Sequence, residues 1–336
     1  GTLDLDSTLT IAANGTLSMP RGELELTGNL DINCTTVADQ FIHNNGTLSV
    51  IPIATSTNLY TGGATFYNVH RTSGDSEWVY QQESCTILKR LYANDYVAWG
   101  VAAASTLTLG DDDTQCTVDG TQYIQITAAN GKVYGGNVLK PALIQAGSGL
   151  QFGAFSQNIK WLDIQVAETI VSGRTVVLDG DMEFDTLTVD SGGILDLNGQ
   201  RMECSGTLTN NGTIDYDGLI VTSGTFNDDG TDNNLASCDI IMTAAQTNVD
   251  SPLSGSTLPR TLMINTGTGT TTTLDGRVGT NTIVASGKLD QSHGDSYATP
   301  TNVTIATGGE LDGDSKTLTV AGDFTTSGGL IGKSAY

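Results

Sequence analysis

The stretch that decides the fold class is Leu187-Thr188-Val189-Asp190-Ser191-Gly192-Gly193-Ile194-Leu195-Asp196-Leu197. Apolar and polar side chains alternate on both sides of its two glycines, which predicts two short strands separated by a bend. Glycine at such a bend accepts a positive φ that other residues resist. Similar patterns, in which a β-branched residue is followed by small residues, a Gly and then Leu or Phe, occupy residues 11–17, 221–226, 284–289 and 305–311.

The spacing of these copies indicates a repeat architecture. Two spacings between copies suggest the length of a coil: a longer one from Val189 to Val221 and a shorter one from Val284 to Ile305. Together they bracket the length of one coil or of one and a half coils. A period of about 20–50 residues is typical of solenoids, propellers and arrays. Asn-Gly dipeptides also favour hairpins, so a β-sandwich array is the alternative. We predict an all-β chain folded as a parallel β-helix, or β-solenoid, in a single elongated domain, because the apolar runs are short and recur with the same turn chemistry.

Composition excludes several classes of protein. The 336 residues include 37 Asp and Glu against 14 Lys and Arg, for a net charge of −23. Such a chain cannot neutralise a row of phosphates, so we expect no nucleic-acid partner. The apolar run at 96–104 is far shorter than the about 20 residues of a membrane span, so none is predicted. Five scattered cysteines without a C-x-x-C pair indicate buried small residues, with one disulfide as an option.

Aromatic residues divide the chain into three predicted zones. Residues 1–58 are expected to form N-terminal β coils, 59–161 an aromatic-rich β middle zone that is wider or elaborated, and 162–336 C-terminal solenoid coils. No helix is predicted, and 76–92 is assigned to strand. The segments 227–234 and 266–273 are poor in core-forming residues, so they are expected as loops or outer turns.

The middle zone also supplies candidate glycan contacts, because sugar rings commonly stack on exposed aromatic side chains. The candidates are Tyr60, Tyr67, Trp78, Tyr80, Tyr92, Tyr96 and Trp99. The competing interpretation, which we favour, places these side chains in the core or in a subunit interface.

Acidic clusters raise the question of calcium, which binds six to eight hard oxygen ligands. The candidate ligands are Asp111, Asp112, Asp113, Asp228, Asp229 and Asp232. None of these clusters has the full twelve-residue calcium-loop pattern, and a solvated acidic turn is the favoured interpretation. No other cofactor is predicted.

Catalytic motifs are not found. A glycosidase needs two carboxylates about 5–9.5 Å apart, and a chain this acidic offers such pairs by chance. Asp111-Asp112 and Asp228-Asp229 look like fragments of the pectin-hydrolase pattern, but its Gly-His-Gly and Arg-x-Lys elements are missing. Lys140 and Arg201 are the least implausible bases for a lyase. We therefore predict no catalytic residues, with a polysaccharide lyase or hydrolase on a β-helix as the alternative.

One phrase resembles a known group of proteins. Residues Phe41-Ile42-His43-Asn44-Asn45-Gly46-Thr47-Leu48-Ser49-Val50, followed by Gly63-Ala64-Thr65-Phe66-Tyr67-Asn68-Val69, look like a repeat in large structural proteins of marine tailed phages. A similar phrase occurs in some bacterial surface proteins. The resemblance is close over 41–69 and loose elsewhere. It implies a virion or cell-surface component without catalytic residues, and it transfers no site.

These observations predict a non-enzymatic structural protein of a phage virion, such as a fibre, spike or capsid appendage, that contacts host-surface glycan. A bacterial extracellular adhesin or surface-filament protein is the alternative. The expected location is the virion or the extracellular surface. The expected partners are other virion or surface proteins and further copies of this chain in a homo-oligomer, since hydrogen-bonded coils leave strand edges to be paired at their ends.

Overall fold

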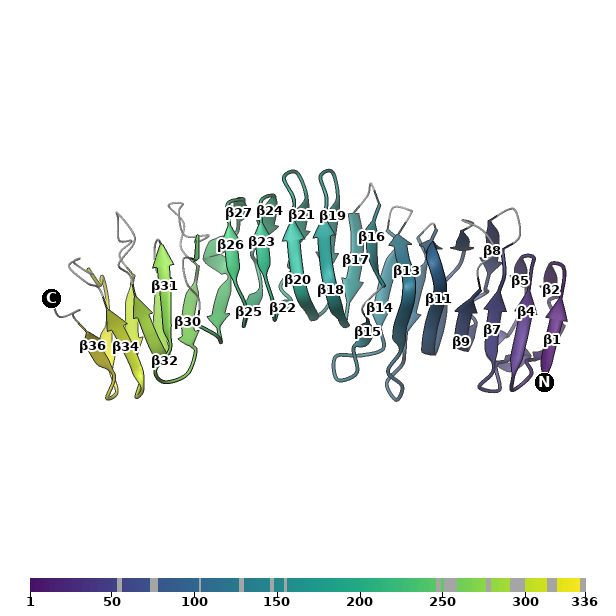
Figure 1. Cartoon of the computed structure of the whole chain (residues 1–336), viewed down its shortest axis with the longest axis horizontal. Coiled ribbons are helices and arrows are strands. Elements are labelled where there is room, and N and C mark those ends of the chain that lie inside the picture. Colours follow the sequence, from purple (N-terminus) through teal and green to yellow (C-terminus); the bar gives the residue numbers. More distant parts are fainter. Residues whose placement is uncertain are drawn as a thin grey trace. The chain divides into compact units, whose positions relative to one another are not determined.

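A computed structural model describes residues 1–52, 56–72, 78–102, 104–126, 130–145, 148–153, 156–245, 249–250, 259–275, 279–290, 300–312 and 319–332. The chain divides into two compact units, Gly1–Glu168 with Arg174–Asp181 and Thr169–Gly173 with Met182–Tyr336. Each unit is a parallel β-solenoid (Figure 1). Among the described residues, antiparallel pairing is limited to the isolated bridges Gly110–Gln115 and Asn137–Lys140. The predicted β-helix is therefore confirmed, and the β-sandwich alternative is wrong.

The first unit consists of short strands and one four-residue helix. Its elements are β1 (Thr2–Leu5), β2 (Leu9–Ile11), β3 (Leu17–Ser18), β4 (Glu23–Leu26), β5 (Leu30–Ile32), α1 (Val37–Gln40), β6 (Phe41–Ile42), β7 (Thr47–Val50), β8 (Thr57–Tyr60), β9 (Thr65–Arg71), β10 (Val79–Gln81), β11 (Cys85–Val101), β12 (Thr106–Leu109), β13 (Thr117–Ile126), β14 (Lys132–Gly135), β15 (Ala142–Ile144), β16 (Gly149–Phe152), β17 (Ser156–Lys160), β18 (Leu162–Ile170) and β19 (Thr175–Leu178). The last two residues of β18 belong to the second unit.

Strand pairing arranges the first unit in three walls. Wall 1 follows β1, β4, β7, β9, β11, β13, β15 and β18. Wall 2 follows β2, β5, β8, β10 and then the later parts of β11 and β13 to β16. Wall 3 begins with the first residues of β9 and β11 and continues through β12, β14, β17 and β19. Long strands such as β11 therefore turn a corner and serve several walls.

The second unit repeats this arrangement with its own elements, which are strands and the short 3₁₀-helix η1. They are β20 (Met182–Val189), β21 (Ile194–Asp196), β22 (Arg201–Cys204), β23 (Leu208–Asn210), β24 (Thr213–Asp215), β25 (Leu219–Thr222), β26 (Phe226–Asp228), β27 (Thr231–Asn233), η1 (Leu235–Ser237), β28 (Asp239–Met242), β29 (Val249–Asp250), β30 (Thr261–Asn265), β31 (Thr271–Asp275), β32 (Asn281–Asp290), β33 (Asn302–Ile305), β34 (Gly309–Asp312), β35 (Phe324–Thr326) and β36 (Leu330–Gly332). Val284 pairs with Ile305, so the shorter of the two predicted spacings is one coil.

The core of each unit consists of inward columns, because alternate residues of a strand face opposite sides. On wall 1, apolar residues that are at most 1% exposed stack in register from coil to coil: Leu24, Leu48, Val69, Leu91, Val118, Ile144 and Ile164. The second unit has a comparable column of Met182, Met202, Ile220, Ile240 and Leu262. Full burial of one such side chain contributes about 1.5–3 kcal/mol, so every coil depends on its neighbours for stability.

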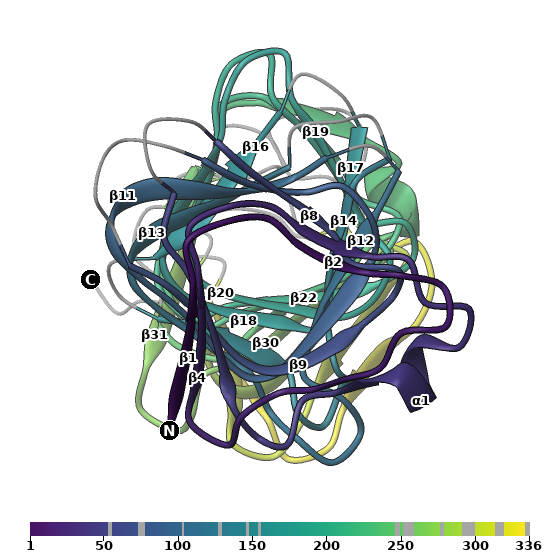
Figure 2. The same ribbon diagram turned by 90° about the vertical axis from the view of Figure 1, so that its right-hand side faces the viewer.

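Several local expectations need correction. The segment 227–234 is not only an outer turn, because β26 ends inside it and the whole of β27 lies within it. The tract 266–273 includes the start of β31, where Thr272 is completely buried. All five cysteines are free, so the optional disulfide is wrong, although four of the thiols are buried as predicted. The short helix α1 was not predicted, and Figure 2 shows it outside the coils of the first unit.

The strand assignment of 76–92 is confirmed for its described part by β10 and the start of β11. The boundaries of the three predicted zones stay a prediction. Within the described part of the chain, neither helix has the length and apolar character required to cross a bilayer.

Candidate functional site

Wall 2 of the first unit carries exposed aromatic rings. Tyr60 at the end of β8 is 43% exposed. The rings of Trp78 and Tyr80 stack with centroids 5.7 Å apart and planes 7° apart, and both side chains are half-buried. Alternation explains the exposure, because Leu59 and Val79 take the inward positions and are completely buried. These rings offer flat apolar surface to a ligand from solvent.

Two further aromatic candidates pair with histidines. Tyr67, at the corner before wall 1, stacks on His43 with centroids 5.8 Å apart. Tyr92 on wall 1 contacts His70 of the preceding coil at 4.8 Å, and the guanidinium of Arg90 lies 4.4 Å from the Tyr92 ring centroid. The predicted glycan candidates are therefore divided between walls and do not form one platform.

Trp99 is a correction to the predicted set of glycan contacts. Its side chain is 1% exposed and its Nε1 donates a hydrogen bond of 3.1 Å to Oε1 of Gln81. Gln81 is also buried and donates from Nε2 to the carbonyl of Thr106. A residue in this position cannot touch a ligand in solvent, so Trp99 belongs to the core. The side chain of Tyr96 lies outside the described part of the structure.

A polar hollow of about 530 Å³ opens on wall 1 near the first coils. Arg21, Glu23, Asn68 and His70 are among the residues that line it. Burial lowers the pKa of His70, and the nearby guanidinium of Arg90 acts in the same direction, while carboxylates oppose it. Nε2 of His70 is buried without a hydrogen-bond partner. A neutral imidazole at this position can accept a hydrogen bond or a proton from a polar ligand.

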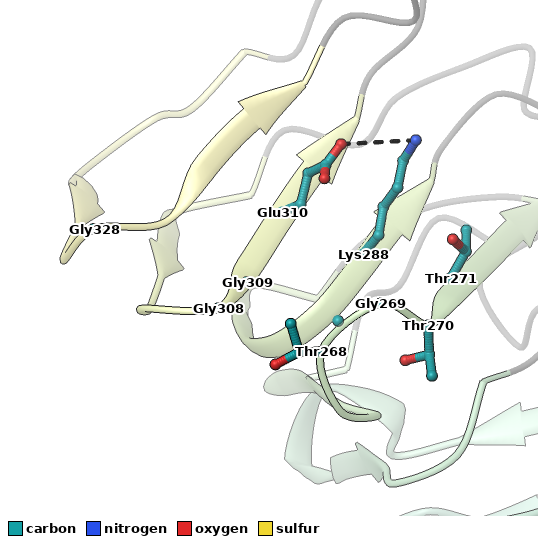
Figure 3. A pocket seen from close by; sticks show the side chains of 10 residues that line it. Thr268, Gly269, Thr270, Thr271, Lys288, Gly308, Gly309, Glu310 and Gly328 are labelled. Atoms are coloured by element: carbon teal, nitrogen blue, oxygen red, sulfur yellow. Dashed lines mark ion pairs between the residues drawn. The ribbon is translucent and has the colours of Figure 1, made fainter.

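The second unit has a groove of similar volume, about 530 Å³, at the bends of successive coils (Figure 3). Gly287, Gly308 and Gly328 line it, and all three have φ values between +84° and +91°. Because this backbone region favours glycine, the bends leave no side chains over the groove. Thr268 and Thr270 supply hydroxyl groups from the loop before β31.

The charges in this groove are paired. Lys288 Nζ lies 2.6 Å from Oδ2 of Asp312 and 3.8 Å from Oε1 of Glu310. The hydrogen bond to Asp312 is the main reason that the pKa of Lys288 is raised. Only 2% of the Asp312 side chain is exposed, so this pair stabilises the local fold. With its described charges engaged in this way, the groove is suited to polar, uncharged groups.

The first group of calcium candidates is engaged in turns. Oδ1 of Asp111 accepts hydrogen bonds from the backbone N–H groups of Asp113 and Thr114, at 3.0 and 2.6 Å. Asp112 accepts hydrogen bonds from Nδ2 of Asn137. Within the described ranges, no three His, Cys, Asp or Glu side chains come together in a way that could hold a metal ion.

The second group does not lie in one solvated turn. Asp228 is 5% exposed and accepts hydrogen bonds from Nδ2 of Asn210, at 2.9 Å, and from the hydroxyl of Tyr216. Asn210 and Tyr216 are completely buried, so Asp228 is part of an internal polar network. Asp229 is exposed. The side chain of Asp232 falls outside the described residues, so the calcium proposal for this loop stays a prediction.

One buried acid has a strongly altered pKa. Glu168 is 5% exposed, and burial raises its pKa to about 8 although the backbone N–H of Leu150 donates to Oε1 at 2.7 Å. A carboxylic acid that stays protonated at neutral pH is what a glycosidase uses as its general acid. Glu168 lines neither of the two cavities described above.

A basic aromatic cluster on wall 3 was missed from the sequence. Lys160 Nζ lies 4.3 Å from the ring centroid of Tyr134 and 4.0 Å from that of Trp161. Lys132 Nζ lies 5.6 Å from Tyr134. Tyr134 and Lys160 are far apart in the sequence, so no local motif joins them, and only the pairing of β14 with β17 brings them together.

Comparison with known proteins finds no matching family model, no similar curated protein and no similar solved structure.

Proposed function

We propose that this chain is a non-enzymatic structural protein of a phage virion, a fibre, spike or capsid appendage, whose outer walls contact glycan on the host surface. The virion location is proposed because the sequence at 41–69 resembles repeats of phage structural proteins. The location on a virion or another extracellular surface, and assembly as a homo-oligomer, are parts of the same proposal.

The stacking of coils carries the proposal. From β1 to β15, each coil of wall 1 is joined to the next by an in-register parallel ladder, as when Leu24 pairs with Leu48 and Leu48 with Val69. Each ladder satisfies backbone groups on both sides, while the inward columns exclude water from the centre of the coils. Such an arrangement resists bending and local opening, which suits a part that must keep its length under load.

The outer walls supply the second support. The net charge of −23 keeps copies of the chain from associating without specificity. Against this background, the half-buried pair Trp78 and Tyr80 and the exposed Tyr60 are apolar surfaces of the kind that stack on sugar rings. The proposed contact needs no change in the core, because all three side chains point outward.

Antibody labelling tests the proposed location on a virion. Antibody against the chain, coupled to gold, is applied to negatively stained material from the source of the protein. We expect label on virus particles, at one structural position. Label confined to cell envelopes would overturn the virion proposal and favour an adhesin or surface filament.

A turnover assay tests the non-enzymatic part. The protein is mixed with uronic-acid polymers, with absorbance followed near 235 nm, and with neutral polysaccharides, with reducing ends measured. We expect no product above that of heat-denatured protein. Turnover that is lost when one groove carboxylate is replaced, as in Glu310→Gln, would contradict the proposal and indicate a polysaccharide enzyme.

A further inference from the structure

The outer face of wall 3 in the first unit has an unusual concentration of positive charge and aromatic surface. β14 places Lys132 and Tyr134 outward, since Val133 between them is completely buried. The next coil places Lys160 outward on β17, directly opposite Tyr134 in the ladder. Trp161 follows at the corner and is half-buried. We call these four residues, Lys132, Tyr134, Lys160 and Trp161, the wall 3 cluster.

The lysines of the cluster are held by ring faces rather than by carboxylates. Lys160 Nζ lies over both Tyr134 and Trp161, and Lys132 Nζ approaches Tyr134. Because both ammonium groups are measured to the same Tyr134 centroid, they are no more than about 10 Å apart. Among the described residues, neither lysine forms an ion pair. Both positive charges therefore remain available to a ligand.

The carboxylate of Asp179, which is hydrogen-bonded to Tyr134, accepts from neutral donors. The hydroxyl of Tyr134 donates to Oδ2 of Asp179, and Nδ2 of Asn158 donates to Oδ1 at 2.8 Å. The bond from Tyr134 helps to fix the ring beside the lysines. Neither lysine is ion-paired with Asp179, so the ammonium groups can take an external anion as their partner.

The backbone of Trp161 supports a functional role. Its φ is +54°, in the left-handed region that a bulky residue rarely adopts. The corner is held there by two hydrogen bonds, from Trp161 N–H to the carbonyl of Asp181 at 2.8 Å and from Ala142 N–H to the carbonyl of Trp161 at 2.9 Å. Glycine or asparagine would meet the same backbone requirement with less strain. Strain of this kind clusters at binding sites, where the side chain is the reason for keeping it.

The neighbouring coil makes room for the indole. A Cβ atom on Gly180 would come within 2.8 Å of Trp161 Nε1, so the indole lies directly against a glycine. A larger residue at 180 would push the ring away from its position. The corner is thus shaped around this side chain, and the indole is presented beside Lys160.

We propose that the wall 3 cluster binds an acidic sugar residue, of the uronic-acid type, within a glycan. The sugar carboxylate pairs with the ammonium group of Lys160 beside Trp161, and the charge of Lys132 adds to the attraction. The C–H face of the sugar packs on the open part of the Trp161 indole. This inference rests on the proposed glycan contact and names its ligand class and its place. Two lysines around one tyrosine ring, in a chain with only 14 basic residues, favour a locally anionic ligand.

The ligand carries its charge on a single residue rather than along a polymer. A long polyanion would be repelled by the net charge of −23, whereas one carboxylate within about a Debye length responds mainly to the cluster. We therefore expect a sugar bearing one carboxylate to bind better than its neutral counterpart, and we expect the preference to weaken as salt is raised.

The experiment compares methyl β-D-glucuronoside with methyl β-D-glucoside, which differ at one carbon, by NMR titration of the full chain. The glucuronoside is expected to bind at least tenfold more tightly. Trp161→Gly is the central variant, because glycine accepts the φ of +54° and so keeps the fold. It should lower the affinity at least tenfold without lowering Tm. Lys160→Gln should have the same effect on affinity.

A matched control lies elsewhere on the first unit. Lys89→Gln removes an exposed lysine of β11 and should leave the affinity unchanged. Equal binding of the two glycosides, no saturable binding, or binding that survives Trp161→Gly would each overturn the proposal. Gold label on virus particles without glucuronoside binding would refute this inference alone. Glucuronoside binding with label only on cell envelopes would refute the virion proposal alone.

Discussion

The sharpest prediction concerns the buried acid Glu168. Replacing it by glutamine keeps the shape of the side chain and an oxygen to accept the 2.7 Å hydrogen bond from the backbone N–H of Leu150. What changes is the ability to ionise. Burial raises the pKa of Glu168 from 4.5 to about 8, so the native state holds this proton more tightly than the unfolded chain does.

The sign of the pH dependence follows from this order of pKa values. Below pH 4.5 the group is protonated in both states, and the full stability is present. As pH rises from 4.5 to about 8, the unfolded chain releases the proton and the native state does not, so stability falls by about 1.4 kcal/mol per pH unit. The total loss above pH 8 is of the order of 5 kcal/mol.

Denaturant unfolding of both proteins between pH 5 and pH 9 measures this loss. The Glu168→Gln variant should gain stability over the natural chain steadily with pH, by several kcal/mol at pH 9. The difference between the two proteins removes the contribution of every other titrating group. A difference that stays constant across this range would refute the buried, protonated state of Glu168.

Three other predictions address packing and reactivity. Gly224→Ala should lower the free energy of unfolding by about 1–3 kcal/mol and should lower Tm as well, because the added Cβ would overlap the carbonyl of Gly206 in the adjacent coil. Tyr216→Phe should cost about 1–3 kcal/mol in denaturant unfolding, since it removes a buried donor from Asp228. In a thiol-titration assay at pH 8, Cys34 should react first, because the other four thiols are buried and burial raises their pKa values; rapid labelling of all five would contradict this.

The sequence did not predict which aromatic side chains point into the core and which point outward. Tyr80 and Trp99 have similar surroundings in the sequence, yet Tyr80 is half-buried on the surface and Trp99 is 1% exposed. The difference is one of register: Val79 pairs with Trp99, and both point inward. A shift by one residue reverses the face of every side chain, and the bends that set this register have no fixed length.

The burial of the polar residue Asp228 likewise depends on strand register rather than on local sequence. In the sequence it belongs to an acidic, glycine-rich stretch that predicts an outer turn. In the fold it continues the inward column of Asn210, because β26 extends to Asp228 and pairs with β23 in register. Its burial depends on a hydrogen-bonding partner, Tyr216, that lies earlier in the chain on another side of the coil.

The sequence by itself predicted the architecture: alternation, glycine bends and their recurrence along the chain are local properties, and together they favour stacked parallel coils over the alternative β-sandwich array. Only the tertiary structure decided which side chains meet on the outer walls. Lys132, Tyr134, Lys160 and Trp161 come together because one coil leads from Lys132 to Asn158, its partner in the ladder. Coil length is not constant, since Arg201 pairs with Leu219 whereas Arg90 pairs with Thr117, a much longer step along the chain. Because loops absorb such differences at little free-energy cost, local sequence cannot specify neighbours across coils.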